Sequence, residues 1–244
     1  AMSGIPGLVG ATPMQNVGAY GQQVSEVITK VEALERSTGK VVSFTNQECD
    51  FDYRSSRFKY KDEGKYIITK VTYRLDPAGS PTVGYPQLAE KLGDEDIESG
   101  TSGLKKVREA TLALRRSKSM VVDPKDPNSR SCGSFFVNPV LGMAQYDALV
   151  KRVQAQGIAE PVPNFASGVD VKVPAAWLIE QAGFKKGERR GGVGISENHP
   201  LALVNHDGTT QQLLALAQEI IQEVLDQFDV ELVREPVLVM PDTS

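Results

Sequence analysis

Residues 131–139 read SCGSFFVNP, a stretch in which a serine lies between a glycine and two phenylalanines and an Asn-Pro pair follows. A serine nucleophile needs a base, usually a histidine, and the sharp turn that presents such a serine has the pattern GxSxG. Ser134 does not fit this pattern, and neither His199 nor His206 has an obvious claim to be its partner. A serine hydrolase is therefore disfavoured, and Ser134 taken alone is typical of a polar residue at the edge of an apolar strand.

The composition is that of a globular protein. Of the 244 residues, 40% are hydrophobic and 24% are charged, and the formal net charge is -4. A chain of this kind can bury a substantial core, in one large domain or in two smaller ones. The basic runs 115–118 and 185–190 are too short for a nucleic-acid interface, but either is long enough to hold the phosphate of a small molecule.

Several kinds of site and location are disfavoured by the residues present. No apolar run approaches the roughly 20 residues of a membrane span, and no signal peptide is evident. Cys49 and Cys132 lie far apart without metal-ligand spacing, and two histidines are too few for a histidine-rich metal site. We therefore expect a cytoplasmic protein with no metal site and with neither a nucleic-acid nor a membrane partner.

Hydrophobic periodicity predicts strands in the first third of the chain, and helices mixed with strands after it. The expected strands are 27–34 and 40–44, joined by a turn at 37–39, then 65–75 and, near the end of the chain, 230–240. The expected helices are 102–118, 145–156, 173–184 and 209–228. In 65–75 the alternation places Ile67, Thr69, Val71, Tyr73 and Leu75 on one face. This order predicts an α+β fold of two lobes, with the loops 121–132 and 156–170 as candidate boundaries.

Residues 3–21, SGIPGLVGATPMQNVGAYG, contain five glycines. They match neither the dinucleotide-binding pattern GxGxxG nor the P-loop. Glycines at this density let the backbone approach a partner closely. The segment is therefore either a loop that cradles a phosphate or a flat ring, or a structural turn.

Five stretches occur together and in a fixed order: 3–21, 51–59, 133–139, 173–187 and 234–238. This set resembles the UDP-N-acetylenolpyruvoylglucosamine reductases (the MurB family, longer-loop subgroup), flavoenzymes of bacterial cell-wall synthesis, from Ser3 to about Leu238. The resemblance implies an α+β fold: the remaining part of the flavin-binding domain in 1–117, a substrate-binding domain in 118–228, and a terminal strand in 229–244 that returns to the active site. The family's N-terminal FAD-binding lobe has no counterpart in this sequence.

The resemblance also implies roles for individual residues. Ser134 matches the serine that acts as general acid, Arg54 matches the arginine beside the enolpyruvyl group and the flavin, and Glu235 matches a C-terminal glutamate of the active site. The substrate-binding residues that it implies are Tyr85, Lys118 and Asn138. The FAD-binding residues that it implies are Gly4, Ile5, Pro6, Gly7, Gly10, Ala11, Gln15, Asn16, Gly18, Ala19, Tyr20, Gly21 and Arg54.

The activity so implied is the reduction of UDP-N-acetylglucosamine enolpyruvate to UDP-N-acetylmuramate, with FAD and NADPH as cofactors, by a protein that is monomeric at full length. Two alternatives stay open: a truncated, non-catalytic fragment that binds a nucleotide sugar, and a different FAD oxidase of the same broad fold. The candidate residues also have structural interpretations. Arg54 can be an ordinary surface arginine, Glu235 a strand-edge partner of Arg234, Lys118 a helix-terminal cation and Tyr85 a residue packed on a turn.

Overall fold

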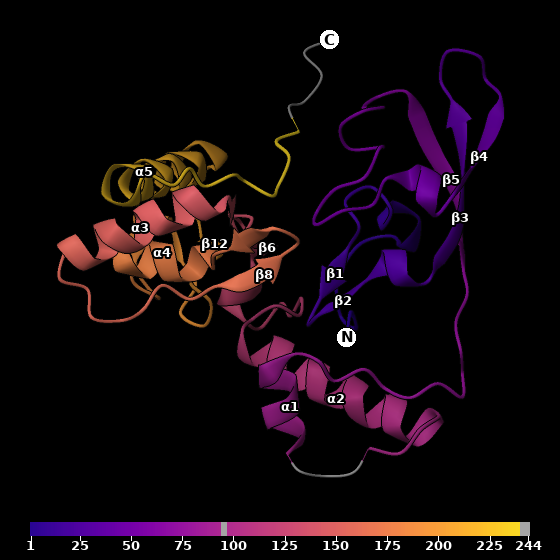
Figure 1. The fold of residues 1–244 in the computed structure, drawn as a ribbon, viewed down its shortest axis with the longest axis horizontal. Coiled ribbons are helices and arrows are strands. Elements are labelled where there is room, and N and C mark those ends of the chain that lie inside the picture. Colours follow the sequence, from indigo (N-terminus) through magenta and orange to yellow (C-terminus); the bar gives the residue numbers. More distant parts are fainter. Residues whose placement is uncertain (94–96, 240–244) are drawn as a thin grey trace. The chain divides into compact units, whose positions relative to one another are not determined.

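A computed structural model describes residues 1–93 and 97–239, and the chain divides into two compact units. Unit 1 is Ala1–Ser117 and unit 2 is Lys118–Ser244. Each unit has its own sheets and its own helices (Figure 1). Each also has its own hydrophobic core. The mixture of antiparallel sheets with helices confirms the α+β class.

Unit 1 opens with short elements and continues into a three-stranded sheet. Its elements are η1 (Val9–Ala11), β1 (Gly18–Ala19), β2 (Gln22–Gln23), η2 (Val24–Glu26), β3 (Ile28–Glu35), β4 (Val41–Thr45), η3 (Gln47–Cys49), β5 (Tyr66–Tyr73), α1 (Pro86–Leu92) and α2 (Thr101–Ser117). The long strand β3 pairs antiparallel with β4 on one side and β5 on the other. The hairpin expected from the sequence is confirmed, because Leu34 pairs with Val41 across the turn.

Strand β5 forms where it was expected, but the face assigned to its residues is wrong for its first half. The register with β3 shifts between Glu32 and Ala33, so Lys70 opposes Glu32 whereas Ile68 opposes Ala33. Such a bulge inserts one unpaired residue and reverses the faces beyond it. Ile68 therefore packs against the core, and Ile67 is 52% exposed.

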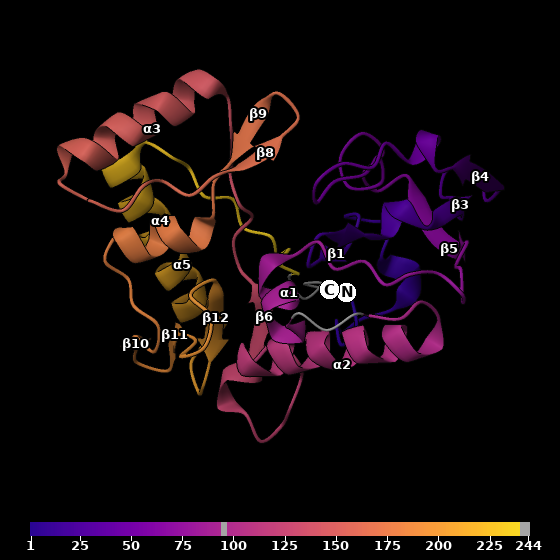
Figure 2. The same cartoon turned by 60° about the horizontal axis from the view of Figure 1, so that its bottom comes forward.

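Helices α1 and α2 pack against each other and close the second core of unit 1 (Figures 1 and 2). Helix α2 confirms the expected helix, with Val107 and Thr111 buried on its inner face. Helix α1 was not anticipated, although Pro86 occupies its first turn, where proline is favoured. Gly103 is required in the first turn of α2, because a Cβ there would lie 1.8 Å from the carbonyl oxygen of Glu98, just before the helix.

Unit 2 carries a four-stranded sheet and a small three-stranded one. Its elements are η4 (Pro127–Ser129), β6 (Ser131–Ser134), β7 (Val140–Leu141), α3 (Met143–Ala155), β8 (Phe165–Ser167), β9 (Asp170–Lys172), α4 (Ala175–Gln181), β10 (Arg189–Arg190), β11 (Val193–Ile195), β12 (Ala202–Asn205) and α5 (Thr210–Phe228). The larger sheet has the antiparallel order β10-β11-β12-β6, and the smaller has β7-β9-β8. The loop 156–170, one of the expected boundaries, lies inside this unit and contains β8.

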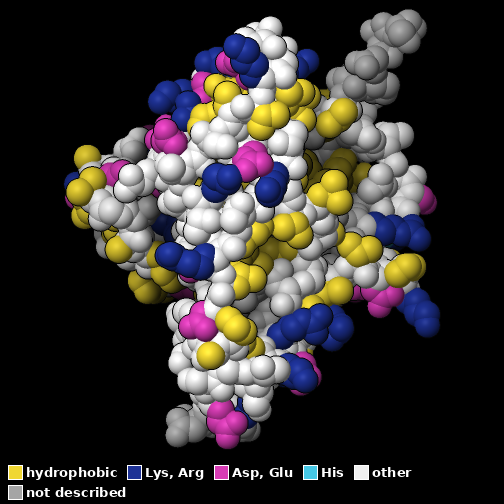
Figure 3. Space-filling model, turned by 90° about the vertical axis from the view of Figure 1, so that its right-hand side faces the viewer, with side chains coloured by type: hydrophobic (Ala, Val, Ile, Leu, Met, Phe, Trp, Pro, Cys, Tyr) yellow, Lys and Arg dark blue, Asp and Glu magenta, His cyan; other side chains and the backbone are white. Residues whose placement is uncertain are grey.

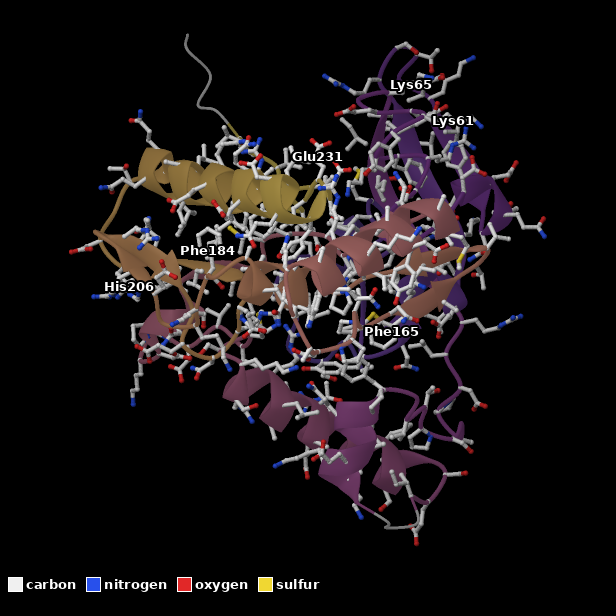
Figure 4. All side chains as sticks on the ribbon, turned by 60° about the vertical axis from the view of Figure 1, so that its left-hand side comes forward. Lys61, Lys65, Phe165, Phe184, His206 and Glu231 are labelled. Atoms are coloured by element: carbon white, nitrogen blue, oxygen red, sulfur yellow. The ribbon has the colours of Figure 1, made fainter. Side chains whose placement is uncertain are left out.

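Helix α5 organises the core of unit 2. Thr209 caps it, accepting a hydrogen bond from the Gln212 N–H, and the stripe Ala217, Ile220 and Val224 is fully buried. Phe184 lies beneath this helix (Figure 4). Trp177 belongs to the same core. The helices 145–156, 173–184 and 209–228 are thus confirmed as α3, α4 and α5, with shorter bounds for α4.

The strand expected at the end of the chain is wrong as a regular strand. Over the described part of 229–244, the pairing is a single antiparallel bridge between Phe136 and Arg234, flanked by hydrogen bonds from Val137 N–H to Val233 and from Glu235 N–H to Phe135. Proline lacks an N–H and cannot extend a ladder, and Pro236 and Pro139 stand on the two sides of the bridge. The last residues of this expected strand, 240–244, lie outside the described residues.

Charge is mixed on one face of the molecule. On the face that Figure 3 shows, Lys and Arg side chains are interspersed with Asp and Glu side chains and with hydrophobic ones. Among the described helices, none is long and apolar enough to cross a membrane.

Candidate functional site

Arg54 lies at the tip of a tight turn in unit 1. Asp52 and Ser55 form an isolated antiparallel bridge around it, and its φ is 52°. Left-handed backbone is costly for a residue with a side chain and is found more often at functional sites. The guanidinium Nη2 donates to the Gly18 carbonyl at 3.0 Å, which brings the arginine to the glycine-rich segment.

The buried side chain of Asn16 fixes the glycine-rich segment to the same turn. Its Nδ2 donates to the Asp52 carbonyl at 3.0 Å and to Gln23 Oε1 at 2.6 Å, and its Oδ1 accepts from the Ser25 N–H at 3.0 Å. The polar groups of Asn16 are thus engaged within the protein. The family resemblance implies that Asn16 binds the cofactor. In the structure its side chain holds the glycine-rich segment in place.

The expected cofactor-binding residues separate by exposure. Gly4, Pro6, Gly7, Gly10, Ala11 and Gly21 are exposed, Ile5, Gln15, Ala19, Tyr20 and Arg54 are half-buried, and Asn16 and Gly18 are buried. Leu8 is 81% exposed and Val9 67%, so apolar side chains stand on the surface beside open backbone.

The glycines of this segment do two different things. A Cβ at Gly7 or Gly10 would meet nothing within 4 Å, whereas one at Gly18 would lie 2.6 Å from the Gln22 carbonyl oxygen. Gly18 is therefore required by the β1–β2 hairpin, whereas Gly7 and Gly10 leave open space beside their backbone. Open space beside exposed apolar side chains fits a flat ring that carries a phosphate.

Tyr20 occupies the tip of the β1–β2 hairpin. Ala19 pairs with Gln22, and the two residues between them, Tyr20 and Gly21, have φ values of 50° and 80°. This is a type I′ turn, whose first central position favours Asn or Gly, so a tyrosine there costs about 1–2 kcal/mol. The Tyr20 ring is edge-on to Tyr85, with 5.2 Å between ring centroids.

In unit 2, the structure brings Ser134 and Glu235 to adjacent positions of the backbone. Ser134 ends β6, where it pairs with Ala202 of β12, and Gly133 before it has a φ of 81°. The next residue, Phe135, donates to the Leu201 carbonyl at 2.7 Å and accepts from the Glu235 N–H at 2.9 Å. Phe135 and Phe136 are buried, so the partly exposed Ser134 is held on a rigid strand end.

Asn138 has a structural bond of its own. Its Oδ1 accepts from the Ala175 N–H at 2.9 Å, at the first residue of α4. The bond satisfies one of the N–H groups that a helix leaves free at its N-terminus. Asn138 therefore ties the SFFVNP stretch to α4 through its Oδ1 acceptor. Its Nδ2 group is a hydrogen-bond donor.

A second cluster in unit 2 brings three basic side chains together. Asn198 Nδ2 donates to Ser119 Oγ at 2.9 Å, beside Lys118, and the Gly187 N–H donates to the Ile195 carbonyl at 3.1 Å, beside Lys186. These bonds draw Lys118 and Lys186 to the segment that carries His199. We call Lys118, Lys186 and His199 the basic cluster.

His199 is neutral and fixed in orientation within the basic cluster. Its Nδ1 accepts from the Leu201 N–H at 3.1 Å, so the ring proton resides on Nε2. Burial, followed by the positive charges of Lys118 and Lys186, lowers the pKa of His199 to about 4. Burial also lowers the pKa of Lys118. Two cations and a neutral donor at one place favour an anionic ligand.

Sequence reasoning named Lys118 and the basic run that holds Lys186, but it assigned no role to His199. The basic run 185–190 was the sequence signal that pointed to a cationic site in this region. The position of His199 depends on hydrogen bonds to residues about 80 positions away, such as Asn198 to Ser119, and no local pattern encodes such contacts.

Similarity to known proteins covers nearly the whole chain. Residues 124–239 match the family model described as UDP-N-acetylenolpyruvoylglucosamine reductase, C-terminal domain. Proteins named UDP-N-acetylenolpyruvoylglucosamine reductase from Streptomyces coelicolor and Thermobifida fusca are 46% and 45% identical over 98% of this chain. The chain spans 63% and 67% of the length of these two relatives.

A solved structure supports the fold. The UDP-N-acetylenolpyruvylglucosamine reductase of Thermus caldophilus matches 96% of this chain and 61% of its own, with a TM-score of 0.55 and 20% sequence identity. At this identity the likeness concerns the fold alone, and the family follows from the 45% identity to the Thermobifida relative, two thirds of whose length the chain covers. The chain belongs to the UDP-N-acetylenolpyruvoylglucosamine reductase family.

Proposed function

We propose that this chain acts in the FAD-dependent, NADPH-using reduction of UDP-N-acetylglucosamine enolpyruvate to UDP-N-acetylmuramate, a cytoplasmic step of peptidoglycan synthesis. The observation that carries the proposal is the identity of 45–46% over 98% of the chain with proteins named for that reductase. Unit 1 would contribute the remaining part of the flavin-binding domain. Residues 118–228 would bind the substrate, and the segment from 229 onward would return Glu235 to the site.

Residues of unit 1 would hold the flavin and the reacting end of the substrate. The open space beside Gly7 and Gly10 suits the cofactor, which when bound supplies the two electrons for reducing a carbon–carbon double bond. Arg54 is anchored by its bond to Gly18 and provides a fixed cation where negative charge develops. A preorganised group of this kind typically contributes about 3–4 kcal/mol to transition-state stabilisation.

Ser134 would move a proton in the reaction. A serine hydroxyl is a weak acid in water, so its effect depends on being held close to the carbon that receives the proton. The rigid end of β6 and the paired Phe135 supply that fixed position. Glu235, bonded through its backbone to Phe135, would assist from the neighbouring position.

The basic cluster would bind the diphosphate of the nucleotide sugar. Lys118 and Lys186 supply positive charge, and neutral His199 supplies an Nε2 donor of fixed orientation. The Nδ2 group of Asn138 and the hydroxyl of Tyr85 would add further donors to the substrate. These roles rest on the charges and hydrogen bonds of each residue together with the family membership.

The decisive test separates cofactor binding from catalysis. Purified chain is incubated with FAD and separated from free flavin, its flavin absorbance is recorded, and NADPH oxidation is then followed with and without the enolpyruvyl substrate. Substrate-dependent oxidation is expected. In Ser134→Ala, reduction of the flavin by NADPH should persist while reoxidation by substrate is lost. Normal rates of both half-reactions in this variant would exclude the proton-donor role.

The alternative function, a non-catalytic fragment that binds a nucleotide sugar, is favoured by the fact that the chain spans 63% of the first relative's length. It predicts a chain that retains no flavin in the same experiment yet binds UDP-N-acetylglucosamine in a calorimeter. Charge reversal at the basic cluster, Lys186→Glu, should then abolish this binding.

A further inference from the structure

Tyr20 occupies a turn position that favours other residue types, and the contacts of its side chain explain why a tyrosine is found there. The first central position of a type I′ turn favours asparagine or glycine, because the backbone there is left-handed. A strained residue persists where the surrounding structure holds it. The half-buried ring of Tyr20 lies edge-on to that of Tyr85, with an interplanar angle of 82°. Edge-to-face pairs of this kind are attractive and orient both rings.

Tyr85 stands at the start of α1, so its ring position is coupled to the first turn of that helix. Its carbonyl accepts from the Leu88 N–H at 2.9 Å and from the Ala89 N–H at 3.0 Å. Tyr20 and Tyr85 both pack against the cluster formed by Leu88, Leu92 and Val107. Tyr20 thus connects the β1–β2 hairpin to the start of α1.

Helix α2 acts on Tyr20 as well. Burial raises the pKa of Tyr20, and the positive charge of Arg115, in the last turn of α2, offsets part of this rise. The guanidinium of Arg115 therefore lies within electrostatic range of the Tyr20 hydroxyl. The hairpin, α1 and α2 meet at this one aromatic side chain.

We propose that Tyr20 is a positioning residue that holds Tyr85 in the orientation in which its hydroxyl meets the nucleotide-sugar substrate. The role rests on the proposed function of Tyr85. Tyr20 would also couple flavin binding to substrate binding, because the hairpin that carries Tyr20 continues the glycine-rich segment assigned to the flavin. When bound flavin orders this segment, Tyr85 would be held in its substrate-binding orientation.

Two substitutions separate the ring of Tyr20 from its turn. Tyr20→Asn places at this position a residue that the left-handed backbone prefers, so the hairpin is retained while the ring is lost. Tyr20→Phe keeps the ring and removes the hydroxyl on which Arg115 acts. Tyr60→Asn, at an exposed tyrosine elsewhere in unit 1, is the matched control.

The first readout needs no ligand. Hydrogen exchange of the Leu88 and Ala89 amides reports the first turn of α1, and we expect Tyr20→Asn to accelerate it about tenfold, with Tyr20→Phe and Tyr60→Asn within about twofold of wild type. Unchanged exchange in Tyr20→Asn would overturn the proposal, because Tyr85 would then be held without Tyr20.

The second readout is the Kd of UDP-N-acetylglucosamine from calorimetry. Loss of an aromatic pair should raise it about fivefold in Tyr20→Asn, and Tyr85→Phe should raise it at least as much. If Tyr85→Phe weakens binding and Tyr20→Asn does not, the positioning role fails while the function assigned to Tyr85 stands. If neither variant weakens binding, the role of Tyr85 in the proposed function fails, and with it the link to substrate. The exchange readout still decides whether Tyr20 holds α1.

Discussion

At the scale of single residues, the surroundings of His199 set its charge. The unfolded chain would protonate this imidazole near pH 6.5, whereas the folded protein, with a pKa of about 4, keeps it neutral. Between these values the unfolded state binds a proton that the folded state does not. The stabilisation is therefore complete above pH 6.5 and is lost as the pH falls toward 4.

This linkage predicts the pH dependence of stability. Between pH 7 and pH 5, His199 should lower the free energy of unfolding by about 2 kcal/mol. In His199→Gln the amide oxygen can still accept from the Leu201 N–H but does not titrate, so most of this dependence should disappear. Urea unfolding of the wild type and of His199→Gln at the two pH values measures it. An unchanged dependence in His199→Gln would show that its pKa is ordinary.

At the scale of secondary-structure elements, the sequence predicts those whose determinants are local. Helix α5 has a capping threonine and an apolar stripe within one segment, and the β3–β4 hairpin has its turn and both strands within 18 residues, from Ile28 to Thr45. Elements that depend on a distant partner were missed or misassigned. The bulge in β5 follows from its pairing with β3, and the terminal bridge is limited by Pro139 and Pro236.

The same difference between local determinants and distant contacts decides which candidate site residues the sequence could predict. Ser134, Asn138 and Glu235 lie in stretches whose order along the chain identifies the family, so the sequence predicts them as site residues, and their roles stay predictions. His199 was missed, and the structural bonds of Asn16 and Asn138 could not be foreseen. Those bonds join segments about 36 residues apart, as in Asn16 to Asp52 and Asn138 to Ala175.

The bulge in β5 makes neighbouring isoleucines unequal. Ile68 packs against the core of unit 1, and Ile67 is on the exposed face. We expect Ile68→Lys to lower the free energy of unfolding by about 2–4 kcal/mol, because a charge would enter the core. Ile67→Lys should change it by less than about 0.5 kcal/mol. Chemical denaturation of the two variants measures both values. If the strand alternated regularly from Ile67 to Leu75, Ile67→Lys would instead be the more destabilising of the two substitutions.

At the scale of the whole molecule, each hydrophobic core cluster draws on one unit. The largest cluster runs from Phe135 to Leu232 within unit 2, and the two smaller ones belong to unit 1. A unit with its own core and its own sheet meets the description of a folding domain. The family model that matches 124–239 coincides with most of unit 2.

Residues 118–244 expressed alone should therefore fold cooperatively, with a single urea transition that different probes report identically. A collapsed state without fixed side-chain packing would also have helical circular dichroism. A pair of variants is therefore needed to distinguish the folded unit from such a collapsed state. Ile220→Ala leaves a cavity under α5 and should cost the isolated unit about 2–5 kcal/mol. Glu231→Ala, at an exposed side chain between buried Val230 and Leu232, should cost less than about 0.5 kcal/mol (Figure 4). Equal, small effects of both variants would mean that this core packs only in the complete chain.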